Sequence, residues 1–209
     1  MTTDRLTLAQ FLSPAMPVGS YAYSQGLEQA MTDGTVHDAQ TLTDWIAAVL
    51  QHGQAKTDAI LAAHARHSDL HHLVDLAFAY ASSSERAMEM RDQGAAFAQV
   101  LQTLTGTAQP PLPYAIALGH ATRALDLATP EILALYLQSL AAQLISAAVR
   151  FLPMGAAEGQ ATLAKLAPLI TRTAEDCATA PLTALATSTL GADIAAMRHE
   201  TLAVRIFRS

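Results

Sequence analysis

Residues 132–149 contain no charged side chain, and this stretch limits the possible folds of the chain more than any other. Its length of eighteen residues is close to the minimum for a membrane-spanning helix. Four polar side chains nevertheless recur at helical spacing in or just after it: Ser139, Gln143, Ser146 and Arg150. One narrow polar stripe on an apolar helix is typical of the centre of a soluble bundle. We therefore predict a core helix over residues 129–151 that does not cross a membrane.

The composition extends the helical prediction to the whole chain. Among 209 residues there are 44 Ala and 29 Leu, while Val is scarce, and Ala and Leu are the strongest helix formers. Helical periodicity runs between breaks at Gly and Pro. We predict an all-α, single-domain bundle of about nine or ten helices over residues 1–209. The expected helices are 6–12, 23–32, 41–51, 56–67, 70–81, 84–106, 114–127, 129–151, 157–179 with a kink at Pro168, and 181–199.

The charge balance and the single cysteine exclude several kinds of protein. With 12 Lys and Arg against 18 Asp and Glu, the net charge is −6, which argues against a nucleic-acid-binding surface. Cys177 stands alone, so neither an internal disulfide nor a cysteine-based zinc site is available. The apolar run at residues 6–12 is at the short limit for the core of a signal peptide, with Asp4 and Arg5 before it and Pro14 and Pro17 after it, so we expect no signal peptide. A reducing, cytoplasmic location follows as the expectation.

A histidine cluster offers one alternative function. His64, His67 and His71 are spaced by three and four residues, and imidazole binds nickel, zinc and copper. A metal-dependent helical hydrolase could be built on such a face. However, Ser68 or Asp69 is a plausible N-cap that would break the helix between these residues. No phosphate-binding loop, nucleophile elbow or zinc-protease motif occurs in the sequence. We expect no catalytic residues, no tight metal site and no cofactor.

Three other segments have the character of interaction sites. Residues 13–28 combine two prolines, two glycines and two tyrosines with almost no charge, as apolar protein–protein contacts do. Residues 150–160 interrupt a long helix with one proline and two glycines. Residues 197–209 place basic side chains among apolar ones in an acidic protein. As simple structural elements, these would be a buried loop, a helix–helix connection and a frayed terminus.

Together these segments resemble the urease accessory protein UreF family. The first is similar to the family pattern S-P-A-L-P-V-G-G-F-S-Y-S-x-G-L-E, with Met16, Ser20, Tyr21 and Ala22 as substitutions. The second is similar to R-L-I-P-L-G-Q-x-x-G-Q. The third is similar to M-R-H-E-T-Q-x-S-R-L-F-R-S, with Leu202 in place of a Gln. If the position of Ser20 requires a positive φ, serine is disfavoured there relative to glycine. Residues 56–129 match only loosely, and no functional residue is assigned to them.

The resemblance implies a non-enzymatic urease maturation factor. Such a protein would bridge UreD (UreH in some organisms) and the GTPase UreG in the complex that inserts nickel into urease apoprotein, often as a homodimer. The residues expected to bind partners are Pro14, Pro17, Gly19, Tyr21, Tyr23, Ser24, Gly26, Glu28, Arg150, Pro153, Gly155, Gly159, Gln160, Arg198, His199, Glu200, Arg205, Phe207 and Arg208.

The basic tail also yields an energetic expectation. If residues 198–209 lie on the surface, their removal costs about 1 kcal/mol of stability or less. Their arginines would then be free to form bidentate bonds with carboxylates of a partner.

Overall fold

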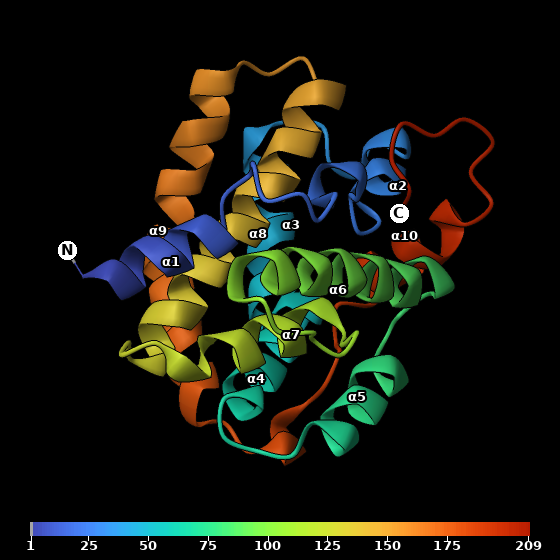
Figure 1. Cartoon of the computed structure of the whole chain (residues 1–209). Helices are drawn as coiled ribbons and strands as arrows, with labels where there is room; N and C mark the ends of the chain where they lie inside the picture. Colours follow the sequence, from blue (N-terminus) through green and yellow to red (C-terminus); the bar gives the residue numbers. More distant parts are fainter. Residues whose placement is uncertain (1) are drawn as a thin grey trace.

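The computed structural model describes residues 2–209, and within this range the chain forms helices and no strand. The predicted all-α bundle is confirmed (Figure 1). The α-helices are α1 (Thr3–Phe11), α2 (Leu27–Thr32), α3 (Ala39–His52), α4 (Gln54–Ala65), α5 (Leu70–Ala79), α6 (Ser84–Thr105), α7 (Tyr114–Ala121), α8 (Thr129–Phe151), α9 (Ala156–Thr179) and α10 (Leu190–His199). Short 3-10 helices cover Ser20–Ala22, Thr122–Ala124 and Leu182–Ala184.

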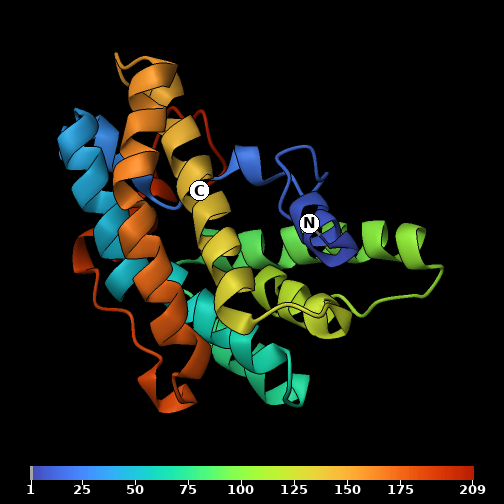
Figure 2. The same cartoon turned by 90° about the vertical axis from the view of Figure 1, so that its left-hand side faces the viewer.

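Helix α8 lies at the centre of the bundle, as the uncharged stretch predicted. It begins with Thr129 and Pro130 and carries Glu131 in its first turn, where an acidic side chain favours the helix dipole. By length and hydropathy α8 could cross a membrane, but 56% of its most apolar window is buried inside the protein. It packs against α2, α3, α4 and α9. Figure 2 shows α3, α8 and α9 running alongside one another, with α6 roughly perpendicular to them and to one side.

Helix α4 is buried along nearly its whole length and meets α7 at a close crossing. A Cβ atom added to Gly119 on α7 would lie 2.2 Å from the carbonyl oxygen of Ala62 on α4. No side chain fits at that distance, so the two backbones depend on a glycine here. This close packing of α4 against α7 forms one side of the core.

Gly119→Val is expected to lower the free energy of unfolding by about 3 kcal/mol, because the two helices must separate to admit the side chain. Chemical denaturation measures the change. Gly191→Ala is the control, since a Cβ atom there meets nothing within 4 Å, and its stability should stay within about 0.5 kcal/mol of the parent. A Gly119→Val protein as stable as the control would contradict the close crossing.

Three expected helix boundaries are wrong. The helix expected over 23–32 begins only at Leu27, because Gln25 and Gly26 both have positive φ values, of 56° and 81°. The helix expected over 181–199 begins at Leu190, after a non-helical stretch with one 3-10 turn. The helix expected over 114–127 ends at Ala121 and continues as a 3-10 turn. Helix α9 is continuous through Pro168.

Candidate functional site

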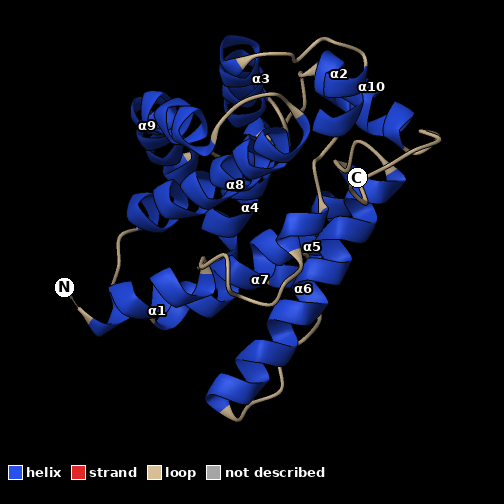
Figure 3. Ribbon diagram, turned by 90° about the horizontal axis from the view of Figure 1, so that it is seen from above, coloured by secondary structure: helices blue, strands red, loops and turns tan. Residues whose placement is uncertain are grey.

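The first loop (residues 13–26), the end of α8 and the C-terminal tail (residues 197–209) meet at one place. The backbone N–H of Ser24 donates to the carbonyl oxygen of Ser209 at 2.7 Å, and that of Arg208 donates to Ala22 at 2.7 Å. Arg150 at the end of α8 donates from Nη2 to the carbonyl oxygen of Tyr21 at 2.9 Å. Figure 3 shows the chain end beside α10 and one end of α6. The structure therefore joins segments from both ends of the chain.

Glu28 holds the tail through its carboxylate. Being in the first turn of α2, it is 1% exposed. Its Oε1 accepts the backbone N–H of Ile206 at 2.7 Å, and its Oε2 accepts that of Phe207 at 3.0 Å. Hydrogen bonds to a charged acceptor are stronger than neutral ones. One side chain thus satisfies two backbone donors of the tail.

His199 connects Glu28 to α6. Its Nε2 lies 2.9 Å from Glu28 Oε2, and its Nδ1 lies 2.7 Å from Glu85 Oε2. The ring is 0% exposed. Arg205 adds a guanidinium, with Nη1 at 2.6 Å from Glu85 Oε1. Two buried carboxylates therefore face an imidazole ring and a guanidinium of the tail.

Aromatic contacts complete the attachment of the tail. Phe207 is buried, and the guanidinium of Arg150 lies 4.5 Å from its ring centre. Arg208 stacks over Tyr23 at 5.3 Å and pairs with Asp92 at 3.0 Å. The Tyr23 hydroxyl donates to the same carboxylate at 3.2 Å. Burial raises the pKa of Tyr23 to about 12, and the charge of Arg208 opposes this increase. Such cation–π contacts each contribute about 0.5–2 kcal/mol.

The tail is not a frayed terminus, and the condition that it lies wholly on the surface is not met. His199, Phe207 and Ser209 are all buried. The tail arginines expected to be free for a partner are paired within the chain: Arg205 with Glu85, Arg208 with Asp92, and Arg198 with Asp33 at 3.8 Å. The tail is part of the folded protein, and its charges first serve to hold it in place.

Helix α6 supplies residues that sequence reasoning missed. Arg86 pairs through Nη1 with Glu89 at 2.7 Å and also with Asp58 on α4, to which the hydroxyl of Tyr136 donates at 3.0 Å. Burial lowers the pKa of Arg86, but the two carboxylates outweigh it and hold the pKa above its ordinary value. Polar residues at positions 85, 86, 89 and 93 recur at helical spacing, and this pattern was the signal available in the sequence.

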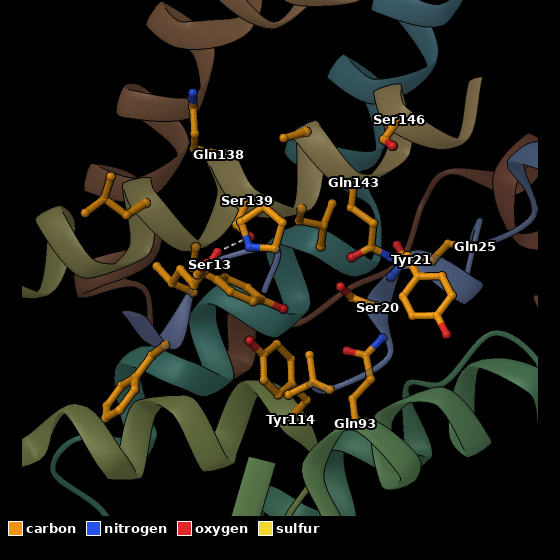
Figure 4. A pocket seen from close by; sticks show the side chains of 18 of the residues that line it. Ser13, Ser20, Tyr21, Gln25, Gln93, Tyr114, Gln138, Ser139, Gln143 and Ser146 are labelled. Atoms are coloured by element: carbon orange, nitrogen blue, oxygen red, sulfur yellow. Dashed lines mark hydrogen bonds between the residues drawn. The ribbon is translucent and has the colours of Figure 1, made fainter. Parts of the chain in front are cut away.

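A cavity of about 540 Å³ opens between the first loop, α6 and α8 (Figure 4). Gln25 and Ser20 approach it from the loop, Gln93 from α6, and Gln143 and Ser139 from α8. The Tyr114 ring also lines it, and burial raises the pKa of that hydroxyl to about 12. Tyr21 of the first loop lines this cavity, as do the buried Arg86, Glu89 and Tyr136.

Of the remaining residues expected to bind partners, some are packed between helices and others are exposed. Gly26 approaches α10 so closely that a Cβ atom would lie 2.6 Å from the backbone nitrogen of Ala196. Gly159 packs against Ile145 on α8. Among the described residues, no hydrogen bond joins the α8–α9 connection at positions 153–160 to the first loop or the tail. Several expected residues are exposed: Pro14, Pro17, Pro153, Gly155, Gln160 and Glu200.

The backbone resolves one smaller expectation, the conformation at Ser20, and a side-chain contact places Glu200. Ser20 is not among the residues with positive φ in the range 2–209, so serine in place of glycine causes no strain there. Glu200 accepts the backbone N–H of Ser84 at 2.8 Å and thereby caps α6. Arg198 and Glu200 therefore lie at the outer edge of the same surface, whereas His199 lies between them and points inward.

The histidine cluster does not form a common face. Helix α4 ends at Ala65, and Asp69 caps α5 by accepting the backbone N–H of His71 at 3.0 Å. His64 is used elsewhere, with Nε2 at 2.9 Å from the carbonyl oxygen of Ala180. Across residues 2–209, no group of three His, Cys, Asp or Glu side chains is placed to hold a metal ion. The hydrolase alternative loses its geometric basis.

Fold and site together define an all-α protein. Its first loop and tail are hydrogen-bonded to each other and form one surface, the braced surface. Residues 36–167 match the UreF family. A Cereibacter sphaeroides protein is 53% identical over 210 residues, covering 100% of both chains, and one from Paracoccus denitrificans is 50% identical over 98% of this chain and 96% of its own. A Dinoroseobacter shibae protein is 47% identical, again over 100% of both chains. All three are named urease accessory protein UreF. The chain belongs to the UreF family.

Proposed function

We propose that this protein is a non-enzymatic urease maturation factor of the cytoplasm. In this role it bridges UreD (or UreH) and the GTPase UreG, as a homodimer, in the complex that inserts nickel into urease apoprotein. It needs no cofactor of its own and binds neither nucleic acid nor membrane. The single observation that carries the proposal is that two of the three family segments, together with Arg150 of the third, form one surface.

Exposed apolar side chains around the tail support the proposal that this surface binds a protein partner. Tyr21 is 72% exposed, Ile206 is 62% exposed, and Val204 is 83% exposed. On α10, Leu190, Ile194 and Met197 are exposed as well, at positions i, i+4 and i+7 of one helical face. Clustered apolar groups of this kind mark interaction sites on soluble proteins more often than single ones do.

The proposed partner-binding residues have two different roles. The exposed ones, such as Tyr21, Arg205 and Arg208, contact partners directly. The buried ones shape and hold that surface: Tyr23, Ser24, Gly26, Glu28, His199 and Phe207. For Gly19, whose φ is 73°, the role is to turn the loop. The α8–α9 connection contributes a separate contact through Pro153, Gly155 and Gln160, with Gly159 packed beneath it.

Tyr21→Ala is expected to weaken assembly with UreD and UreG about thirtyfold, which corresponds to the roughly 2 kcal/mol typical of an aromatic hot spot. Because the ring is mostly exposed, thermal unfolding of the isolated variant should remain unchanged. Co-purification of the complex and activation of urease in cells measure the effect.

Leu104→Ala is the matched control, because Leu104 is 49% exposed near the far end of α6, away from the first loop and tail. It should assemble and activate urease normally. Full assembly and activation by a folded Tyr21→Ala protein would refute the direct role of the first loop.

A further inference from the structure

A second, much smaller cavity lies beneath the end of the tail. Its volume is about 20 Å³, and it is bounded by Gln25 of the first loop, Arg86 of α6, Thr189 before α10, and Ser209 of the tail. Asp193 of α10 also lines it. A single water molecule requires about 10–15 Å³ of such space. The cavity is therefore large enough for one water and too small for an organic ligand.

Three buried polar atoms belonging to the residues around this cavity have no hydrogen-bond partner within residues 2–209. They are Gln25 Oε1, Arg86 Nε and Thr189 Oγ1. Arg86 is 6% exposed and Thr189 is 9% exposed, so bulk solvent does not satisfy them. A buried donor or acceptor without a partner destabilises the folded state. Gln25, Arg86 and Thr189 all line this small cavity, and Gln25 and Arg86 also line the larger one. Unpartnered atoms on three residues around one small cavity are the basis for inferring a shared partner.

The donor and acceptor roles of these atoms identify the partner. Gln25 donates from Nε2 to Glu89 Oε1 at 2.9 Å, which fixes its amide so that Oε1 must accept. The Nε–H of Arg86 can only donate. The occupant must therefore donate to one atom and accept from another. A metal cation or ammonium cannot accept, and a halide cannot donate, whereas water does both.

Thr189 has a side chain that is available for this role. It occupies the N-cap position of α10, yet its hydroxyl makes no capping hydrogen bond. A Cβ atom on Gly53 would lie 2.7 Å from Thr189 Oγ1. Glycine at position 53 therefore leaves room for the Thr189 hydroxyl. A hydroxyl can donate or accept, and it completes a three-coordinate water site.

We propose that one structural water molecule is bound by Gln25 Oε1, Arg86 Nε and Thr189 Oγ1. This water links the first loop, α6 and the start of α10 beside the last residue of the tail. Buried waters typically make about three such bonds. Its position makes it part of the support of the tail, independently of any partner protein.

A crystal structure of the full chain that resolves ordered waters tests the site. We expect a water within about 3.2 Å of all three atoms. The proposal is overturned if the cavity holds no water, or if any of the three atoms is bonded to a protein group instead.

Amide hydrogen exchange at Arg208 tests the role in holding the tail. Thr189→Val should accelerate this exchange about fivefold, equivalent to about 1 kcal/mol for one hydrogen bond, whereas Thr189→Ser should leave it unchanged. Thr122→Val is the control, because that buried hydroxyl donates to the carbonyl oxygen of Gly119 at 2.9 Å, away from the tail. Unchanged exchange in Thr189→Val would overturn the supporting role even where the water is seen.

Discussion

Truncation after Met197 is expected to lower the free energy of unfolding by about 5 kcal/mol. Loss of Phe207 burial accounts for about 2 kcal/mol, and loss of His199 and Arg205 leaves Glu28 and Glu85 as buried carboxylates without their partners, which costs about 3 kcal/mol or more. For a chain of this size, the melting temperature should fall by about 10 °C or more. Differential scanning calorimetry of the full-length and truncated proteins measures the change.

Val204→Ala is the control for this experiment, since Val204 is in the same tail but 83% exposed. Its melting temperature should match that of the parent. A truncated protein that melts within about 3 °C of the full chain would show that the tail is not needed for folding. Because truncation damages the fold, the contact role of the tail is better tested with the exposed Ile206→Ala.

Arg86→Met is expected to destabilise the protein by about 3–5 kcal/mol, because Asp58 and Glu89 would remain buried without a compensating charge. Equilibrium denaturation in urea measures the loss. The double variant Arg86→Met with Glu89→Gln should recover at least about 1 kcal/mol, since one of the two uncompensated charges is removed.

Arg91→Met serves as the matched control for the charge on α6. Arg91 is exposed and stacks over Phe78 at 5.0 Å, so its loss should cost less than about 1 kcal/mol. Equal destabilisation by the two single variants, or no recovery in the double variant, would contradict the assignment of a buried charge cluster.

Local sequence signals predicted most helices because they act over a few residues. Thr129 and Pro130 begin α8, Ser83 caps α6 by accepting the backbone N–H of Arg86, and Gly106 ends α6 with a φ of 71°. Each signal depends on hydrogen bonds or dihedral angles within one helical turn. The late start of α10 was missed because the non-helical course of residues 180–189 is set by tertiary contacts, such as that between Ser188 and His52.

The site was predicted only in part because its bonds join distant residues. Motif resemblance identified the first loop and the tail separately, but Glu28 and His199 are 171 positions apart. Nothing in either segment indicates that a carboxylate and an imidazole will meet in the core. The apolar and basic character of residues 197–209 suggested a surface segment, whereas the buried partners of these side chains, Glu28 and Glu85, belong to other helices.

The separation between Glu28 and His199 has a consequence for the order of synthesis. A ribosome adds about 5–20 residues per second, so the 171 positions between the two residues take roughly 10–30 s to make. Throughout that interval, Glu28 and the first loop are present in the growing chain without the segment that covers them. The braced surface can therefore assemble only late, after residues 198–209 have emerged, and an interrupted chain would expose its first loop unbraced.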